Sequence, residues 1–179
     1  EVRANCWAQL GLCHKELKDY YASGLTLDQL ARLYPEDGRS NNAAFWSTIL
    51  LGYAYKDSRG STYVAKAYLD AQEFFVETYP GDPRGGKMAF RLGDLRRGVG
   101  NYKEAIEYYA RVVEASPYYE QARYHIGDAQ WREYLNATRN LKLEEKDKVP
   151  PEAAKYLEAA IETLTTLVKW ADEQPAPKT

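Results

Sequence analysis

Four glycines recur at regular intervals inside stretches that otherwise have the apolar pattern of amphipathic helices. Gly11, Gly52, Gly93 and Gly127 lie 41, 41 and 34 residues apart, and each directly follows a leucine or an isoleucine. Glycine inside a helix costs about 1 kcal/mol relative to alanine, so its return at this spacing needs a packing reason. A period of 34 to 41 residues is typical of a helical solenoid.

Prolines divide the same stretches into pairs of helices. Pro35, Pro80 and Pro117 follow the first three glycines by 24, 28 and 24 residues. The residue before a proline is pushed out of the α region, so a helix ends there. Each unit is therefore predicted as a first helix (helix A), a turn, a second helix (helix B) and a proline-marked turn. The sequence predicts an all-α, right-handed solenoid of about four helical hairpins.

The spacing also predicts where the units begin and end. We expect one helical repeat domain over 1–172, with units at roughly 4–35, 42–80, 84–117 and 118–172, and a disordered tail or linker over 173–179. In unit one, YASG is the expected turn and Thr26 the expected N-cap of helix B. In unit three the helices are predicted at roughly 85–98 and 103–116. In unit four helix A is expected to continue to about residue 143 and the last helix to span roughly 152–172.

The recurring glycine has an expected place in this arrangement. A residue without a side chain, placed where helix A crosses helix B, lets the two backbones approach each other. Ala105 is the matching small residue in unit three. Closer packing would then offset the propensity cost of the glycine.

The repeated motif resembles the tetratricopeptide repeat. The resemblance is carried by Trp7, Leu10, Gly11, His14 and Pro35 in unit one, by Leu51, Gly52 and Tyr55 in unit two, and by Leu92, Gly93, Ala105, Tyr109 and Pro117 in unit three. Arg96 replaces the usual aromatic of helix A in unit three, and unit four lacks the closing proline. The resemblance covers nearly the whole chain and implies a helical scaffold that binds other proteins.

Two shorter motifs are similar to those of bacterial envelope proteins of this family. They are Tyr-Pro-Gly-Asp-Pro at residues 79–83 and Leu-Gly-Asp at residues 92–94. The similarity implies a bacterial protein of the periplasm or cell envelope, with the cytoplasm as the alternative.

The family's concave surface is formed by helix A, and its positions can be counted from the Leu-Gly anchor. The residues expected to bind a partner there are Asn5, Gln9, Trp46, Tyr53, Lys87, Phe90, Arg91, Asp94, Tyr124, His125 and Asp128. The same count also places Ala8, Leu12, Ile49, Leu50 and Gln121 on this surface.

Some family members hold the C-terminal carboxylate of a partner in a five-residue basic clamp. Lys87 and Arg91 match two of its positions, whereas Ala8, Leu12 and Leu50 stand at the other three. We therefore expect a mixed channel, apolar in unit two and cationic in unit three. Such a channel suits an extended or helical peptide with apolar anchors and an acidic group. The alternative is that Trp46 and Phe90 belong to the core.

Composition and the remaining motifs argue against other classes of function. The net charge of -2 and the pI of about 5.8 give no general attraction to nucleic acid or anionic membranes, and no apolar stretch is long enough for a membrane span.

Cys6 and Cys13 would be about 10.5 Å apart along one helix, too far to bridge each other. GDPRGGKM at residues 81–88 resembles a phosphate loop, but Met88 replaces its Ser or Thr and a helix precedes it.

The two histidines have no metal-binding spacing, and no cofactor or metal site is expected. His14 holds the aromatic position of its unit and is expected to pack in the core. The sequence thus predicts a non-catalytic protein-interaction module. The alternatives are a structural or assembly segment, which packs its concave face on its own domains or on another copy, and an enzyme or a small-ligand pocket.

Overall fold

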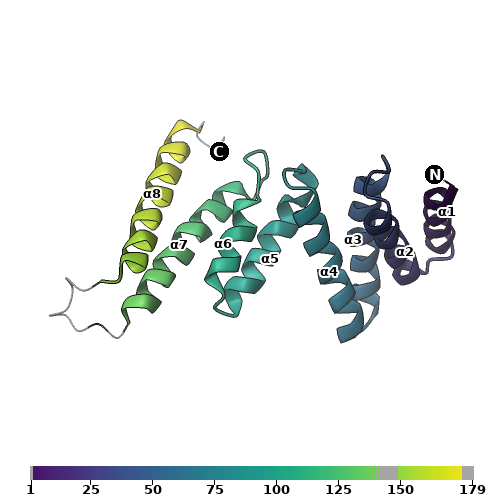
Figure 1. Cartoon of the computed structure of the whole chain (residues 1–179), viewed down its shortest axis with the longest axis horizontal. Coiled ribbons are helices and arrows are strands. Elements are labelled where there is room, and N and C mark those ends of the chain that lie inside the picture. The colour runs from purple at the N-terminus through teal and green to yellow at the C-terminus, as the bar shows by residue number, and fades with distance from the viewer. Residues whose placement is uncertain (1, 140, 142–148, 175–179) are drawn as a thin grey trace, which may run out of the picture. The chain divides into compact units, whose positions relative to one another are not determined.

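The computed structural model describes residues 2–139, 141 and 149–174, and their regular structure is entirely helical (Figure 1). In these ranges the helices are α1 (Val2–Glu16), α2 (Tyr20–Leu33), α3 (Ser40–Asp57), α4 (Thr62–Thr78), α5 (Gly86–Gly98), α6 (Tyr102–Ala110), α7 (Tyr119–Thr138) and α8 (Pro151–Glu173), with a short 3-10 helix, η1 (Pro83–Gly85). The predicted all-α helical-repeat architecture is confirmed. The handedness of the array stays a prediction.

The helices form two compact units, Glu1–Gly85 and Gly86–Thr179. In the first unit α1 packs on α2, α2 on α3 and α3 on α4, and in the second α5 packs on α6, α6 on α7 and α7 on α8. Leu30, Leu51 and Phe75 are buried in the first unit. Tyr109 and Ile126 are buried in the second. Each unit therefore has apolar residues of its own inside.

The recurring glycines lie at close helix crossings, as predicted. A Cβ on Gly11, Gly93 or Gly127 would stand 2.6 Å from a helix B side chain, and one on Gly52 would stand 3.3 Å from Tyr68. We predicted that the backbones of helix A and helix B approach each other at these glycines, with Ala105 facing Gly93, and this was wrong for Gly93. At Gly93 the three nearest atoms all belong to the ring of Tyr109, and none to Ala105. The glycine makes room for a large side chain of helix B.

The start of α2 corrects two predictions for unit one. The YASG segment is helical, because α2 begins at Tyr20, where Asp19 accepts a hydrogen bond from the Ala22 N–H at 3.0 Å and acts as the N-cap. Thr26 lies inside the helix, and its hydroxyl donates to the Ala22 carbonyl. Gly24 is not a turn residue either, since a Cβ there would stand 2.7 Å from Leu51 of α3.

Three other boundaries differ from the prediction. Helix α6 ends at Ala110, six residues early, because the Arg111 and Val112 N–H groups bond to carbonyls three residues back and tighten the chain into turns. Helix α7 ends at Thr138, and the rest of its predicted extension to residue 143 lies mostly outside the described residues. Glu173, predicted as the start of the tail, is the last residue of α8; residues 175–179 are not described.

Candidate functional site

An apolar groove of about 310 Å³ lies in the first unit, where α1, α2 and α3 meet. It is lined by Ala8, Leu12, Lys15, Leu27, Leu30, Arg39, Asn42, Ala43, Trp46 and Leu50. Four of these lining residues, Ala8, Leu12, Trp46 and Leu50, were placed on the concave surface from the sequence. The structure therefore brings helix A positions of two successive repeats together in one groove.

Trp46 lies at the rim of this groove and is not a core residue. Its side chain is 49% exposed, with the ring of Phe45 at 6.0 Å and the Lys15 ammonium 6.0 Å from its ring centre. Leu27 and Leu30 are buried beneath it. The groove thus combines an apolar floor, an exposed indole and a nearby cation, which are features of protein-binding pockets.

The other residues predicted for this unit lie around the groove and do not line it. Asn5 and Gln9 are exposed on α1, and the Asn5 side-chain carbonyl accepts a hydrogen bond from the Arg39 guanidinium. Tyr53 is half exposed on α3, with its ring 5.5 Å from that of Tyr20. Asn5 and Tyr53 thus already have contacts inside the unit.

Arg39 is fixed at the groove wall by the carboxylate of Asp37. Its Nε and Nη2 donate to the two oxygens of that carboxylate, each at 2.7 Å, and its backbone N–H bonds to the same group at 3.0 Å. This fork lowers the pKa of the Asp37 carboxyl well below its ordinary value, chiefly through the Arg39 hydrogen bonds. The Arg39 charge at the groove is therefore already paired.

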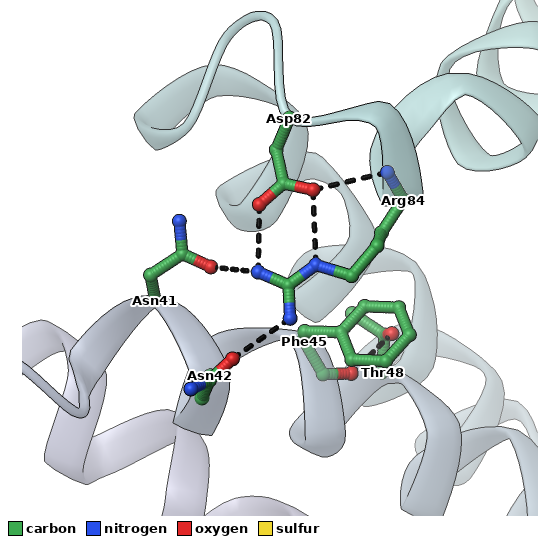
Figure 2. Close-up of polar contacts among 6 residues, drawn as sticks. All are labelled: Asn41, Asn42, Phe45, Thr48, Asp82 and Arg84. Atoms are coloured by element: carbon green, nitrogen blue, oxygen red, sulfur yellow. Dashed lines mark hydrogen bonds and ion pairs between the residues drawn. The ribbon is translucent and has the colours of Figure 1, made fainter. Parts of the chain in front are cut away.

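A second fork of the same kind holds Asn42 at the groove wall (Figure 2). The Nε and Nη2 of Arg84 donate to Asp82 at 2.9 and 2.7 Å, and its Nη1 donates to the Asn42 carbonyl oxygen at 2.8 Å. Arg84 also donates to Asn41 and lies 4.7 Å above the ring of Phe45. Hydrogen bonds from Arg84 lower the pKa of Asp82 to about 2. The loop before α5 thereby holds the first turn of α3 in place.

The helix A face of the second unit centres on a cluster of rings. Phe90 of α5 lies 5.7 Å from Tyr109, 5.3 Å from Tyr118 and 5.6 Å from His125 of α7. The rings of Tyr109 and Tyr124 also lie beside His125, at 5.3 and 5.4 Å. Phe90 and His125 are half buried, so they support the packing of α5 on α6 and α7 and show only part of their surface.

The surroundings of His125 favour its neutral form. Its Nδ1 is buried without a hydrogen-bond partner. Burial lowers the pKa of the imidazole below its ordinary value, with a further contribution from the charge of Arg97, while Asp94 and Asp128 act in the opposite direction.

The two predicted aspartates of this face are paired with cations. Asp94 accepts a hydrogen bond from the Tyr109 hydroxyl at 2.7 Å and lies 3.4 Å from Arg97. Asp128 lies 2.9 Å from Arg132 and 3.7 Å from Arg97. Asp94, Arg97 and Arg132 line a polar hollow of about 250 Å³ with Gly98 and Tyr102.

Lys87, Arg91 and Tyr124 are the exposed members of the predicted set in the second unit. Lys87 lies in the first turn of α5. The segment before α5 is a 3-10 helix that follows α4. The guanidinium of Arg84 in this segment forms an ion pair with the Asp82 carboxylate. The phosphate-loop alternative therefore lacks the strand-to-helix context that its chemistry needs.

The structure also places the two cysteines and the first histidine. Cys6 and Cys13 are both free and exposed on α1, and His14 is half buried on the same helix. Within the described residues, no group of three or more His, Cys, Asp or Glu side chains is placed to hold a metal ion. No described helix has the length and apolar character to cross a bilayer.

Sequence reasoning missed Lys15, Arg39 and Asn42 as lining residues of the groove. A signal for the two forks was present, because Tyr-Pro-x-Asp-x-Arg occurs at both 34–39 and 79–84. Two loops with the same pattern predict the same local structure. In contrast, the hydrogen bonds from these loops to α1 and α3 have no counterpart in the linear pattern.

Helical hairpins repeated along the chain, with a glycine under a large side chain at each crossing, define a protein of the helical-repeat class. Residues 86–119, which span α5 and α6, match the family model of the tetratricopeptide repeat. The chain therefore contains a tetratricopeptide repeat. A comparison with curated proteins finds no match. The repeat indicates a role in protein–protein interaction or as a scaffold, and proteins of this family are generally non-catalytic.

Proposed function

We propose that this protein binds a peptide or protein partner through its helix A surface, without catalysis. The observation that supports this most directly is the apolar groove of the first unit with Trp46 half exposed at its rim. A large indole exposed beside buried leucines leaves apolar area in water, and a partner that covers this area gains its burial free energy.

The residues that line the groove indicate which kind of partner segment would fit it. An apolar side chain of the partner would fill the groove beside Leu12 and Trp46. An acidic group next to it would meet the ammonium of Lys15, because the charge of Arg39 is already paired with Asp37. On the second unit, the exposed Lys87 offers a separate cationic contact on α5. An apolar anchor close to an acidic group is thus the expected motif.

The proposal is tested by capture from an extract of the source organism, followed by binding of the purified partner. Immobilised wild type is compared with Trp46→Ala and with Tyr63→Ala, a control that removes an exposed ring from α4 outside the groove. We expect Trp46→Ala to cost about 2 kcal/mol, an affinity loss of about 30-fold. Circular dichroism checks that both variants keep their helicity.

The control decides between this proposal and its alternatives. A partner that binds wild type and Trp46→Ala equally, but is lost with Tyr63→Ala, would place recognition on another face and contradict the proposal. Capture of this same chain through the groove would favour an assembly role for the concave face. A charge reversal, Lys87→Glu, tests the second contact and is expected to weaken binding by about 1 kcal/mol or less, more at low salt.

A further inference from the structure

Helix α1 carries an exposed apolar stripe on a face that does not line the groove. Val2, Cys6, Leu10 and Cys13 follow one another along α1 at spacings of three or four residues, and Leu17 continues this spacing directly after the helix. All five are exposed. Such spacing puts them on one side of the helix. None of them lines the groove, so contacts made through this stripe are independent of partner binding in the groove.

The internal repeat shows what covers this stripe elsewhere in the chain. Superposing Gly11 on Gly52 or Gly127 places Leu10 at the position of Leu51 in α3 or Ile126 in α7. Leu10 is 46% exposed, whereas Leu51 is 0% and Ile126 4% exposed. In the first unit the cover is the preceding helix B, since Gly24 of α2 lies directly against Leu51. The stripe of α1 therefore has the form of a surface that receives a helix B.

Helix α8 carries the complementary surface. Leu27 of α2 packs against Gly11, and Leu164 of α8 packs against Gly127, so the two leucines hold equivalent positions in their helices. The alignment places Ile161 at the position of Gly24 and Val168 at that of Ala31. Gly24 and Ala31 are buried, but Ile161 and Val168 are 58% and 60% exposed. In α2 this side of the helix faces α3, whereas the corresponding side of α8 is exposed.

Charge also favours pairing of these two helices. Helix α8 has five acidic residues and two lysines, a net charge of -3, whereas α1 has Arg3, Lys15 and Glu16, a net charge of +1 with histidine neutral. Helices α2 and α3 run antiparallel, because Tyr20 meets Tyr53 and Gly24 meets Leu51. Copied onto α8 and α1, this arrangement puts Ile161 on Leu10.

We propose that this protein associates head to tail, with α8 of one copy packed on α1 of the next in the arrangement of α2 on α3. A contact between two different surfaces of the same chain leaves one of each surface free, so it continues into rings or open chains of copies. Ile161 is larger than Gly24, so the two helices stay further apart than α2 and α3. The association is therefore weaker than the internal contact and depends on concentration.

Two variants of the full chain, each blocked at one end, test the proposal. Leu10→Glu puts a charge in the α1 stripe, and Ile161→Glu puts one in the α8 stripe. Sedimentation equilibrium is measured over an about hundredfold range of concentration, in reductant because both cysteines are exposed. We expect wild type to grow in mass with concentration and each variant alone to stay monomeric. Their equimolar mixture should form a one-to-one dimer, twice the monomer mass, that does not grow further.

Each other outcome overturns the proposal. If the Ile161→Glu chain alone dimerises, α1 pairs with a second α1; if the Leu10→Glu chain alone dimerises, α8 pairs with α8. If wild type stays monomeric and the mixture forms no dimer, the two stripes do not bind each other. Val99→Glu, an exposed apolar residue outside both stripes, is the matched control and should behave as wild type. Circular dichroism confirms that all three variants are folded.

Discussion

At the scale of single residues, the glycines of helix A decide how closely helix B side chains can pack. A methyl group on Gly93 would stand 2.6 Å from the ring of Tyr109, which is fully buried and bonded to Asp94. We predict that Gly93→Ala destabilises the protein by about 1–3 kcal/mol, although alanine is the better helix former. Gly98→Ala is the control on the same helix, because nothing lies within 4 Å of that site.

Urea unfolding followed by circular dichroism measures both glycine variants. The midpoint should fall for Gly93→Ala and stay equal or rise for Gly98→Ala. A Gly93→Ala midpoint at or above that of Gly98→Ala would contradict the packing role of the glycine.

His125 gives the second unit a predicted pH dependence. The pKa of its imidazole is lowered in the folded protein, by burial first and by Arg97 second, so the unfolded chain binds the proton more readily. The folded state therefore has its full stability, as far as His125 is concerned, above the ordinary histidine pKa of 6.5. This part of the stability is lost as the pH falls below 6.5 toward the lowered pKa of the folded protein. His125→Phe keeps a ring in the cluster and should reduce the loss of stability between about pH 7.5 and pH 5.5.

The histidine prediction is measured as the urea midpoint of both proteins at several values in this range. Asp37 and Asp82 titrate far below this range, because their arginine partners lower their pKa. An unchanged pH slope in His125→Phe would show that His125 is not the group responsible.

At the scale of elements, the loop of Asp82 and Arg84 is predicted to stabilise the start of α3. Arg84→Lys keeps a positive charge but loses the fork to Asp82 and the planar contact with Phe45. We expect a loss of about 1 kcal/mol, since the guanidinium is about a third exposed. Hydrogen–deuterium exchange should show faster exchange in the first turns of α3. Lys66→Arg on the exposed face of α4 is the control, and equal exchange in both variants would contradict the role of the fork.

The helices show which local signals predict structure and which do not. The prolines predicted where the hairpins end, because proline acts through the backbone at a known position. The glycine spacing predicted that the hairpins repeat, because each glycine leaves room for a helix B side chain. The YASG segment failed as a predicted turn because the helix that Asp19 caps already begins at Tyr20, one residue before the segment, and because Gly24 packs against Leu51. Small polar residues favour both turns and close helix contacts, and only the tertiary partner distinguishes the two.

The predicted surface shows the same division. Family positions counted from the Leu-Gly anchor found four of the residues that line the groove, because a repeat fixes which helix positions share a face. They could not show that Arg97 of α5 reaches Asp128 of α7, or that Phe90 is packed among three rings. Those contacts join different elements, whereas the pairs of Asp94 with Arg97 and of Asp128 with Arg132 lie within one helix at spacings of three and four residues.

At the scale of the whole molecule, two compact units predict local responses to mutation. Repeat proteins transmit stability mainly between neighbouring elements. Gly93→Ala should therefore raise hydrogen–deuterium exchange in α5 and α6 more than in α1 and α2. An equal rise in all helices would show that the chain unfolds as one cooperative body and would contradict this prediction.

The central claim is that a partner is recognised at the groove beside Trp46, and site-specific photo-cross-linking tests it most directly. A photoreactive phenylalanine analogue replaces Trp46 in one protein and Tyr63 of α4 in another, and both are irradiated with the captured partner. We predict a covalent adduct from position 46 and none from position 63. An adduct from position 63 alone, with none from position 46, would show that the partner binds another face and would contradict the claim.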